Sequence, residues 1–126
     1  MALFTELTVY KVARSLRKKI SELVKKQFPI EEKYRLSDQI LRSSRGVTNC
    51  ISEGYGRYNY QDISRFCRMS RGSLMETLDH LIIAYDEKII TEEQLKEYKA
   101  DIDICLKLLN GYINYLQRQK NGGSVE

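Results

Sequence analysis

The sequence predicts an all-α protein whose single domain, residues 1–126, is an up-down-up-down antiparallel four-helix bundle. Three observations favour this fold class. Apolar residues recur at steps of three and four through four long segments, which is the period of a helix with one buried face. One Pro and seven Gly in 126 residues are too few for a turn-rich β fold. The connections between the four segments are short, so consecutive helices are expected to lie antiparallel.

The first helix is expected over residues 6–27 and the second over residues 36–53. Pro29 ends the first helix, because the residue before a proline is disfavoured in the α conformation. Gly54 and Gly56 end the second helix. The apolar stripe of the first helix consists of Val9, Val12, Ala13, Leu16, Ile20, Leu23 and Val24, and the inward side of the second consists of Ile40, Ser44, Val47 and Ile51.

The third helix is expected over residues 60–88 and the fourth over residues 91–118, with a frayed tail at 119–126. The fourth helix begins with a capping box, in which the side chains of Thr91 and Gln94 each bond to the backbone N–H of the other. The stripe of the third helix is Ile63, Phe66, Cys67, Ser70, Leu74, Thr77, Leu78, Leu81 and Tyr85, and that of the fourth is Leu95, Tyr98, Ile102, Cys105, Leu109, Tyr112, Ile113 and Leu116.

Composition excludes several classes of protein. Hydrophobic residues form 42% and charged residues 30% of the chain, which is the balance of a globular domain and not of a disordered tail. No apolar run approaches the ~18 residues that a membrane span requires, so no membrane contact is expected. Three cysteines without CxxC spacing (Cys50, Cys67 and Cys105) predict buried thiols in a reducing cytoplasm, and argue against a disulfide framework or a zinc site.

The sequence offers no catalytic constellation. His80 is the only histidine, has no partner at HxxxH or ExxH spacing, and is expected at the surface of the third helix or at the boundary of the core. No GxSxG, Walker A or GxGxxG motif occurs. A nucleophilic cysteine would need a nearby base, for which only His80 is available. We therefore expect a protein that is not an enzyme and that binds neither a metal nor a cofactor.

Positive charge is concentrated in the middle of the chain. The net charge is +4, and residues 42–71 alone hold six Arg against two acids, while the remaining 15 basic and 15 acidic residues cancel. Arginine presents a planar fork that fits phosphates, carboxylates and aromatic faces. We expect these six arginines to contact nucleic-acid phosphates: Arg42, Arg45, Arg57, Arg65, Arg68 and Arg71.

Arginine and glycine share the predicted outward faces of the second and third helices. These faces carry Arg42, Arg45, Gly46, Asn49 and Glu53 on the second helix, and Arg65, Arg68, Gly72 and Glu76 on the third. A mid-helix glycine costs about 1 kcal/mol relative to alanine. Two of them on outward faces predict a close approach from outside the bundle, by a second subunit or by a nucleic-acid backbone.

Two alternatives apply to the same faces. They are solvated surfaces on which the glycines are tolerated, or neighbouring helices neutralise the arginines by ion pairs. In the expected antiparallel register, the facing pairs are Glu53 with Arg65, Asn49 with Arg68, and Arg42 with Glu76.

The predicted loop between the second and third helices interleaves tyrosine with arginine. Tyr55, Tyr58 and Tyr60 surround Arg57 within six residues, 55–60. Such a pattern suits stacking on unpaired bases together with phosphate contact. The alternative is that the rings cap the end of the bundle and satisfy their hydroxyls at its rim.

Several short motifs together carry a family resemblance. They are Leu7-Thr8-Val9-Tyr10-Lys11-Val12-Ala13, Phe28-Pro29, Glu32-Lys33-Tyr34-Arg35-Leu36, Gln39-Ile40-Leu41-Arg42, Glu53-Gly54-Tyr55-Gly56-Arg57, and Arg71-Gly72-Ser73-Leu74 with Glu76. In combination, from about residue 7 to 116, the chain resembles the four-helix-bundle proteins encoded in intervening sequences of bacterial 23S ribosomal RNA genes. It departs from the usual pattern at Gly46 and Cys50, where the family has Ser and Asn.

The resemblance implies a homo-oligomeric ring, typically a pentamer. It also implies kinship to the accessory variability proteins of diversity-generating retroelements, which look like basic pentameric barrels that bind nucleic acid and a reverse transcriptase. The expected function is a non-enzymatic nucleic-acid-binding or nucleoprotein adaptor, with RNA favoured over DNA and a protein as a further partner. The alternative is a structural or protein-interaction module whose Arg and Gly faces form the subunit interface. The residues assigned to structure or assembly are Gly46, Glu53, Gly54, Gly56, Gly72, Ser73 and Glu76.

Overall fold

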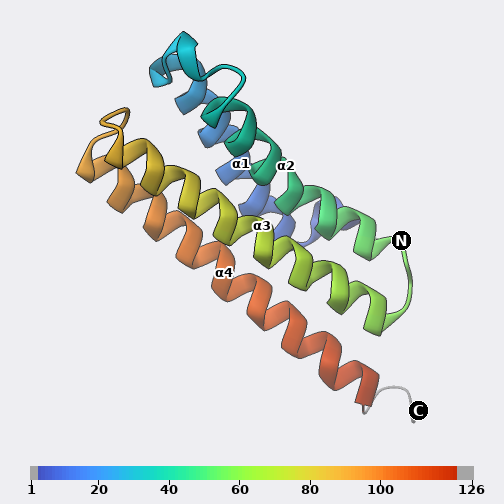
Figure 1. Ribbon diagram of the computed structural model, residues 1–126. Coiled ribbons are helices and arrows are strands. Elements are labelled where there is room, and N and C mark those ends of the chain that lie inside the picture. The colour runs from blue at the N-terminus through green and yellow to red at the C-terminus, as the bar shows by residue number, and fades with distance from the viewer. Residues whose placement is uncertain (1–2, 122–126) are drawn as a thin grey trace.

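The computed structural model describes residues 3–121 and consists of four long helices packed antiparallel in a bundle (Figure 1). The helices are α1 (Thr8–Gln27), α2 (Leu36–Tyr55), α3 (Tyr60–Asp86) and α4 (Glu92–Asn121), with short 3-10 turns η1 (Phe4–Glu6) and η2 (Ile30–Glu32) before α1 and α2. α2 packs on α1 and α3, and α4 closes the bundle by packing on α3 and α1. The predicted all-α four-helix fold is confirmed. None of the helices between residues 3 and 121 is both long and apolar enough to cross a membrane.

The helix boundaries differ from the predicted ones by two or three residues. α1 starts at residue 8 because η1 occupies residues 4–6, and α3 ends at Asp86, just before Lys88 adopts a left-handed φ of 64°. α2 continues through Gly54 to Tyr55. α4 extends to residue 121, so the first part of the predicted tail is helical, and residues 122–126 of that prediction lie outside the described residues.

Side-chain caps fix the starts of α3 and α4. The predicted capping box of α4 is confirmed, since the Gln94 N–H donates to Thr91 Oγ1 (3.1 Å) and the Thr91 N–H donates to Gln94 Oε1 (2.9 Å). At α3, Asn59 Oδ1 accepts from the backbone N–H groups of Gln61 (3.0 Å) and Asp62 (3.1 Å). These bonds satisfy donors that a helix start leaves without partners. The Asn59 cap also defines where the α2–α3 turn ends.

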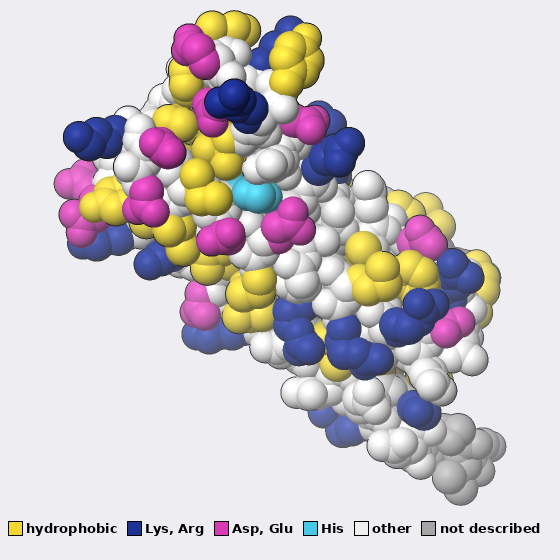
Figure 2. Space-filling model, viewed as in Figure 1, with side chains coloured by type: hydrophobic (Ala, Val, Ile, Leu, Met, Phe, Trp, Pro, Cys, Tyr) yellow, Lys and Arg dark blue, Asp and Glu magenta, His cyan; other side chains and the backbone are white. Residues whose placement is uncertain are grey.

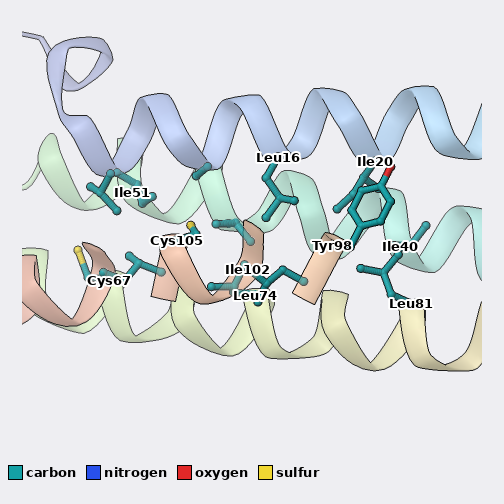
Figure 3. Packing of buried hydrophobic residues seen from close by; sticks show 14 of the residues in the cluster. Leu16, Ile20, Ile40, Ile51, Cys67, Leu74, Leu81, Tyr98, Ile102 and Cys105 are labelled. Atoms are coloured by element: carbon teal, nitrogen blue, oxygen red, sulfur yellow. The ribbon is translucent and has the colours of Figure 1, made fainter. Parts of the chain in front are cut away.

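The core is a continuous column of apolar side chains from all four helices (Figure 3). At one level of the bundle, Ile20, Ile40, Leu81 and Tyr98 bring together one residue from each helix. The predicted stripes supply this core with one difference. Tyr85 is 37% exposed, and its neighbour Ala84 is fully buried in its place.

Small polar residues form the seam between α2 and α3. Ser70 Oγ donates to the backbone carbonyl of Val47 (2.7 Å), and Thr77 Oγ1 donates to Ser43 Oγ (2.8 Å). All three hydroxyl-bearing side chains are buried. Because their hydroxyls are bonded across the seam, α2 and α3 approach closely without a desolvation penalty for these groups.

Alkaline pH is expected to destabilise the bundle through its buried thiols. Burial raises the pKa of Cys67 and of Cys105 from 9.0 to about 11. The unfolded state therefore binds fewer protons than the folded state above about pH 9, and stability falls between about pH 9 and 11 by at most about 1.4 kcal/mol per pH unit for each thiol. Urea unfolding under reducing conditions across this range measures the slope. Cys105→Ala should flatten it, and an unchanged slope in that variant would contradict the assignment.

Candidate nucleic-acid interface

Five tyrosines line a groove at the end of the bundle where the α2–α3 turn meets the last turns of α4. The groove has a volume of about 540 Å³ and is lined by Leu7, Tyr55, Tyr58, Tyr60, Ile63, Tyr112, Tyr115 and Leu116. We call it the tyrosine groove. It contains all three tyrosines of the predicted loop. It adds Tyr112 and Tyr115, which sequence reasoning did not assign to a site. A Tyr-x-x-Tyr spacing on α4 was the available signal for this pair.

The groove presents aromatic faces in two arrangements. The rings of Tyr112 and Tyr115 are stacked, with centroids 6.3 Å apart and planes 8° from parallel. Burial raises the pKa of Tyr112 to about 12, as expected for a ring packed largely inside the groove wall. Tyr58 is 83% exposed and adopts a φ of 59°, which is uncommon for a bulky residue. Half-buried and exposed rings side by side suit a planar ligand.

Two predicted arginines, Arg57 just after α2 and Arg65 of α3, share one aromatic ring. The guanidinium carbons of Arg57 and Arg65 lie 4.9 and 4.8 Å from the ring centroid of Phe66. Arg57 also donates from Nη2 to Glu53 Oε2 at 3.0 Å. The Phe66 ring therefore holds these two guanidiniums close to each other, and the Glu53 carboxylate also orients that of Arg57.

The alternative of ion pairs between α2 and α3 is wrong. Glu53 pairs with Arg57 (3.0 Å), just beyond the end of α2, Arg42 pairs with Asp38 (3.6 Å) and Glu76 with His80 (3.3 Å), each with a residue four positions away in the chain. Residues at this spacing are nearest neighbours on a helix surface, closer than the outward faces of two different helices. Glu76 thus does not order a guanidinium.

The other four arginines of the predicted set have no carboxylate partner within ion-pair distance in residues 3–121. They are Arg45, Arg65, Arg68 and Arg71. Arg68 Nη1 donates to Ser64 Oγ (2.7 Å), and Arg71 Nη1 donates to Asn110 Oδ1 (2.7 Å). Figure 2 shows Lys and Arg side chains outnumbering acidic ones on the half of the visible face toward the α2–α3 turn, whereas basic and acidic side chains are mixed on the other half.

The glycines divide into two kinds, and the prediction for two of them is wrong. Gly46 does not face outward, since a Cβ there would lie 2.9 Å from Ser73 Oγ in the α2–α3 seam. Gly54 does not end α2. It is buried, and a Cβ there would lie only 2.7 Å from the Cβ of Phe66. A helical-wheel projection shows how far Gly46 lies from the core stripe of its own helix. It does not show that a neighbouring helix covers that side. Gly56 is the C-cap residue with a right-handed φ of −74°.

Gly72 retains its predicted outward position. A Cβ at Gly72, or at Gly111 of α4, would meet nothing within 4 Å. The bond from Arg71 to Asn110 places these two glycines at the same height, because each directly follows one of the bonded residues. Exposed apolar side chains accompany Gly72 on α3, since Met69 and Met75 lie three residues to either side of it. We call Met69, Gly72, Met75 and Gly111 the α3–α4 outer face.

Another basic surface lies between α1 and α2, and the sequence analysis assigned only one of its residues. A groove of about 460 Å³ is lined by Arg17 and Lys18 of α1 and by Arg45 of α2. Only Arg45 belongs to the predicted set. The sequence did contain a signal, because no acid occurs between Glu6 and Glu22. The charge count treated Arg17 and Lys18 as part of the residues outside 42–71, whose 15 basic and 15 acidic groups cancel.

His80 is buried, although it was expected at the surface or at the boundary of the core. It is 8% exposed, its Nε2 lies 3.3 Å from Glu76 Oε2, and its Nδ1 has no hydrogen-bond partner. It shares one side of α3 with the buried Thr77, three residues before it, and Ala84, four residues after it. Within residues 3–121, no group of three or more His, Cys, Asp or Glu side chains is arranged to hold a metal ion.

Comparison with known proteins agrees with this architecture. A search of curated proteins found no match. Residues 5–111 match the family model described as 23S rRNA-intervening sequence protein. The matched span begins in η1 and ends within α4, so it includes the α2–α3 turn and most of the tyrosine groove. The chain therefore belongs to the 23S rRNA-intervening sequence protein family.

Proposed function

We propose that the protein is a non-enzymatic, cytoplasmic, homo-oligomeric adaptor that binds RNA. The observations that carry the proposal are the tyrosine groove and, near the same α2–α3 turn, the guanidiniums of Arg57 and Arg65 over the Phe66 ring. Unpaired bases stack on tyrosine faces while guanidiniums contact the adjoining phosphates. Single-stranded loops and ends of RNA offer bases in this form, whereas a duplex keeps its bases stacked inside.

The predicted arginines differ in how readily they can contact RNA phosphates in this proposal. Arg57 and Arg65 contact phosphates next to stacked bases, and Arg68 lies one helical turn further along α3 from Arg65. Their contacts with Phe66 and Ser64 orient the guanidiniums and leave further N–H donors for a ligand. Arg42, by contrast, lies beside the Asp38 carboxylate, which reduces its attraction for phosphate.

Replacing Arg65 and Arg68 together by alanine should weaken binding to an RNA hairpin with a single-stranded loop. Each lost phosphate contact lowers the slope of log K against log salt by roughly 0.7 for single strands, so the double variant should lose roughly 1.4. Fluorescence anisotropy across a salt series measures this slope. The matched control replaces Lys96 and Lys107, exposed cations of α4 that are paired to Glu92 and Asp103. Equal slopes for the two double variants would overturn the role of Arg65 and Arg68.

The homo-oligomeric part of the proposal rests on the α3–α4 outer face. Gly72 and Gly111 leave the backbone of both helices open to close approach, and the exposed side chains of Met69 and Met75 flank Gly72 on α3. Exposed apolar groups next to glycine favour helix packing from a second copy over contact with water. A ring built through this face would repeat the tyrosine groove once per subunit.

The second candidate function is a structural or protein-interaction module without nucleic-acid binding. The open backbone at Gly72 favours it, because self-association alone explains that residue. Light scattering with and without RNA separates the two functions. An oligomer that gains mass with RNA, and loses that gain at high salt, supports the adaptor. An oligomer indifferent to RNA supports the structural module.

A further inference from the structure

We propose that the groove between α1 and α2 is a second nucleic-acid contact, one that binds the phosphodiester backbone and not the bases. This inference rests on the proposed RNA-binding function and names a surface separate from the tyrosine groove. Arg17 and Lys18 of α1 and Arg45 of α2 line it, together with the neutral polar side chains of Ser21 and Asn49. We call it the α1–α2 groove.

The α1–α2 groove contains three cations and no carboxylate. Several cations elsewhere on the surface differ in this respect. Lys26, Arg42, Arg57, Lys96 and Lys107 each pair with a carboxylate four residues earlier in the chain. Both helices that form the groove are free of acids where they face it, at residues 7–21 and 39–52. Its positive charge is therefore not neutralised locally.

Arg17 is held in place before any ligand arrives. Its Nη1 donates to Thr48 Oγ1 at 3.0 Å, and that hydroxyl in turn donates to the backbone carbonyl of Arg45 at 3.1 Å. Thr48 is 1% exposed, so the bond is fixed from the buried side of α2. One of the five N–H donors of the guanidinium is used here, and four are left for an anion. A preorganised fork binds a phosphate with less loss of side-chain entropy.

The positive surface continues along α1 beyond the groove. Lys18 also lines a neighbouring groove of about 610 Å³ with Arg14 and with Lys11, whose Nζ lies 3.8 Å from Glu6 Oε2. Lys11, Arg14 and Lys18 follow one another at three- and four-residue steps, so they share one side of the helix. At about 1.5 Å per residue this row is about 10 Å long, enough to follow more than one phosphate of a strand.

This arrangement suits a polyanion and carries no stability benefit for the fold. Like charges at i and i+4, such as Arg14 and Lys18, oppose helix formation. Lys19 of the same segment does stabilise the fold, because it bonds to Glu97 (2.6 Å) and Asp101 (2.7 Å) and so links α1 to α4. No aromatic ring lines the α1–α2 groove itself, so it offers phosphate contacts without base stacking.

The test compares two charge-matched variants in RNA-binding anisotropy across a salt series. The groove variant carries Arg17→Gln and Lys18→Gln, and the control carries Lys96→Gln and Lys107→Gln on α4. Near 0.1 M salt the groove variant should bind the labelled RNA hairpin about tenfold more weakly or worse, with a salt slope lower by roughly 1.4. The control should bind as the wild type does. Urea unfolding midpoints of both variants establish that the groove variant is folded at the assay temperature.

The outcomes separate this inference from the function on which it rests. Wild-type RNA binding that weakens in the Arg65 and Arg68 variant but not in the groove variant overturns the groove proposal alone. A wild type that does not bind the hairpin overturns the proposed function. Calorimetric titration with inorganic tripolyphosphate then addresses the source of phosphate. Binding of tripolyphosphate that the groove variant loses, without any RNA binding, assigns the groove to a free polyphosphate and overturns the nucleic-acid assignment.

Discussion

Gly54→Ala is expected to destabilise the bundle by about 1–3 kcal/mol, as overpacking of a closed site does. The added Cβ would lie 2.7 Å from the Cβ of Phe66 and 3.4 Å from the backbone carbonyl oxygen of Ile63. Neither atom is the free end of a flexible side chain, so α2 and α3 must separate locally. That separation also disturbs the Phe66 ring, over which Arg57 and Arg65 lie. Urea unfolding of the wild type and the variant measures the loss.

Two other glycines serve as controls for Gly54. Gly72→Ala meets open space and should be neutral or stabilising, since alanine is favoured over glycine by about 1 kcal/mol in a helix. Gly46→Ala should cost less than Gly54→Ala, because its closest neighbour is the hydroxyl of Ser73, which can rotate away. If Gly54→Ala unfolds at the same urea concentration as Gly72→Ala, the close α2–α3 contact at Gly54 is disproved.

The fold was predictable because each helix carries its own signal. A stripe such as Val9, Ala13, Leu16 and Ile20 identifies both the helix and the side that it buries. The start of α4 was also predictable, because the capping box of Thr91 and Gln94 is visible in the sequence. The less accurate ends are those that depend on tertiary contact. α2 continues through Gly54, and that glycine packs against α3. Sequence rules for helix ends consider only neighbouring residues and so do not include this contact.

The site was predictable only where it is local in the chain. Tyr55, Tyr58 and Tyr60 could be assigned together because they share one turn. Tyr112 and Tyr115 join them from α4 through the antiparallel packing of the bundle, which brings residues half the chain apart to the same end. The cations of α1 were missed for a related reason. Their significance depends on facing an acid-free stretch of α2, which net charge does not record.

Gly72→Leu is expected to dissociate the proposed oligomer into monomers. Gly72 lies at the centre of the α3–α4 outer face, with Met69 and Met75 three residues to either side. A leucine there would hold an approaching helix away from the α3 backbone, and close packing of a repeated interface tolerates little added volume. Light scattering across a dilution series measures the mass. Gln39→Leu, which adds the same apolar side chain at an exposed position of α2, is the matched control.

The Gly72 test is specific because the isolated chain has no reason to lose stability. Nothing lies within 4 Å of the added Cβ, and leucine is favoured over glycine in a helix by roughly 0.5–1 kcal/mol, so the monomer should be unaffected or slightly more stable. Loss of mass together with retained unfolding free energy therefore assigns Gly72 to assembly. If the variant keeps the wild-type mass, the α3–α4 outer face is not the subunit interface. If the dissociated variant still binds RNA, but with a smaller salt slope, one subunit suffices for base stacking, and the ring adds phosphate contacts from neighbouring copies.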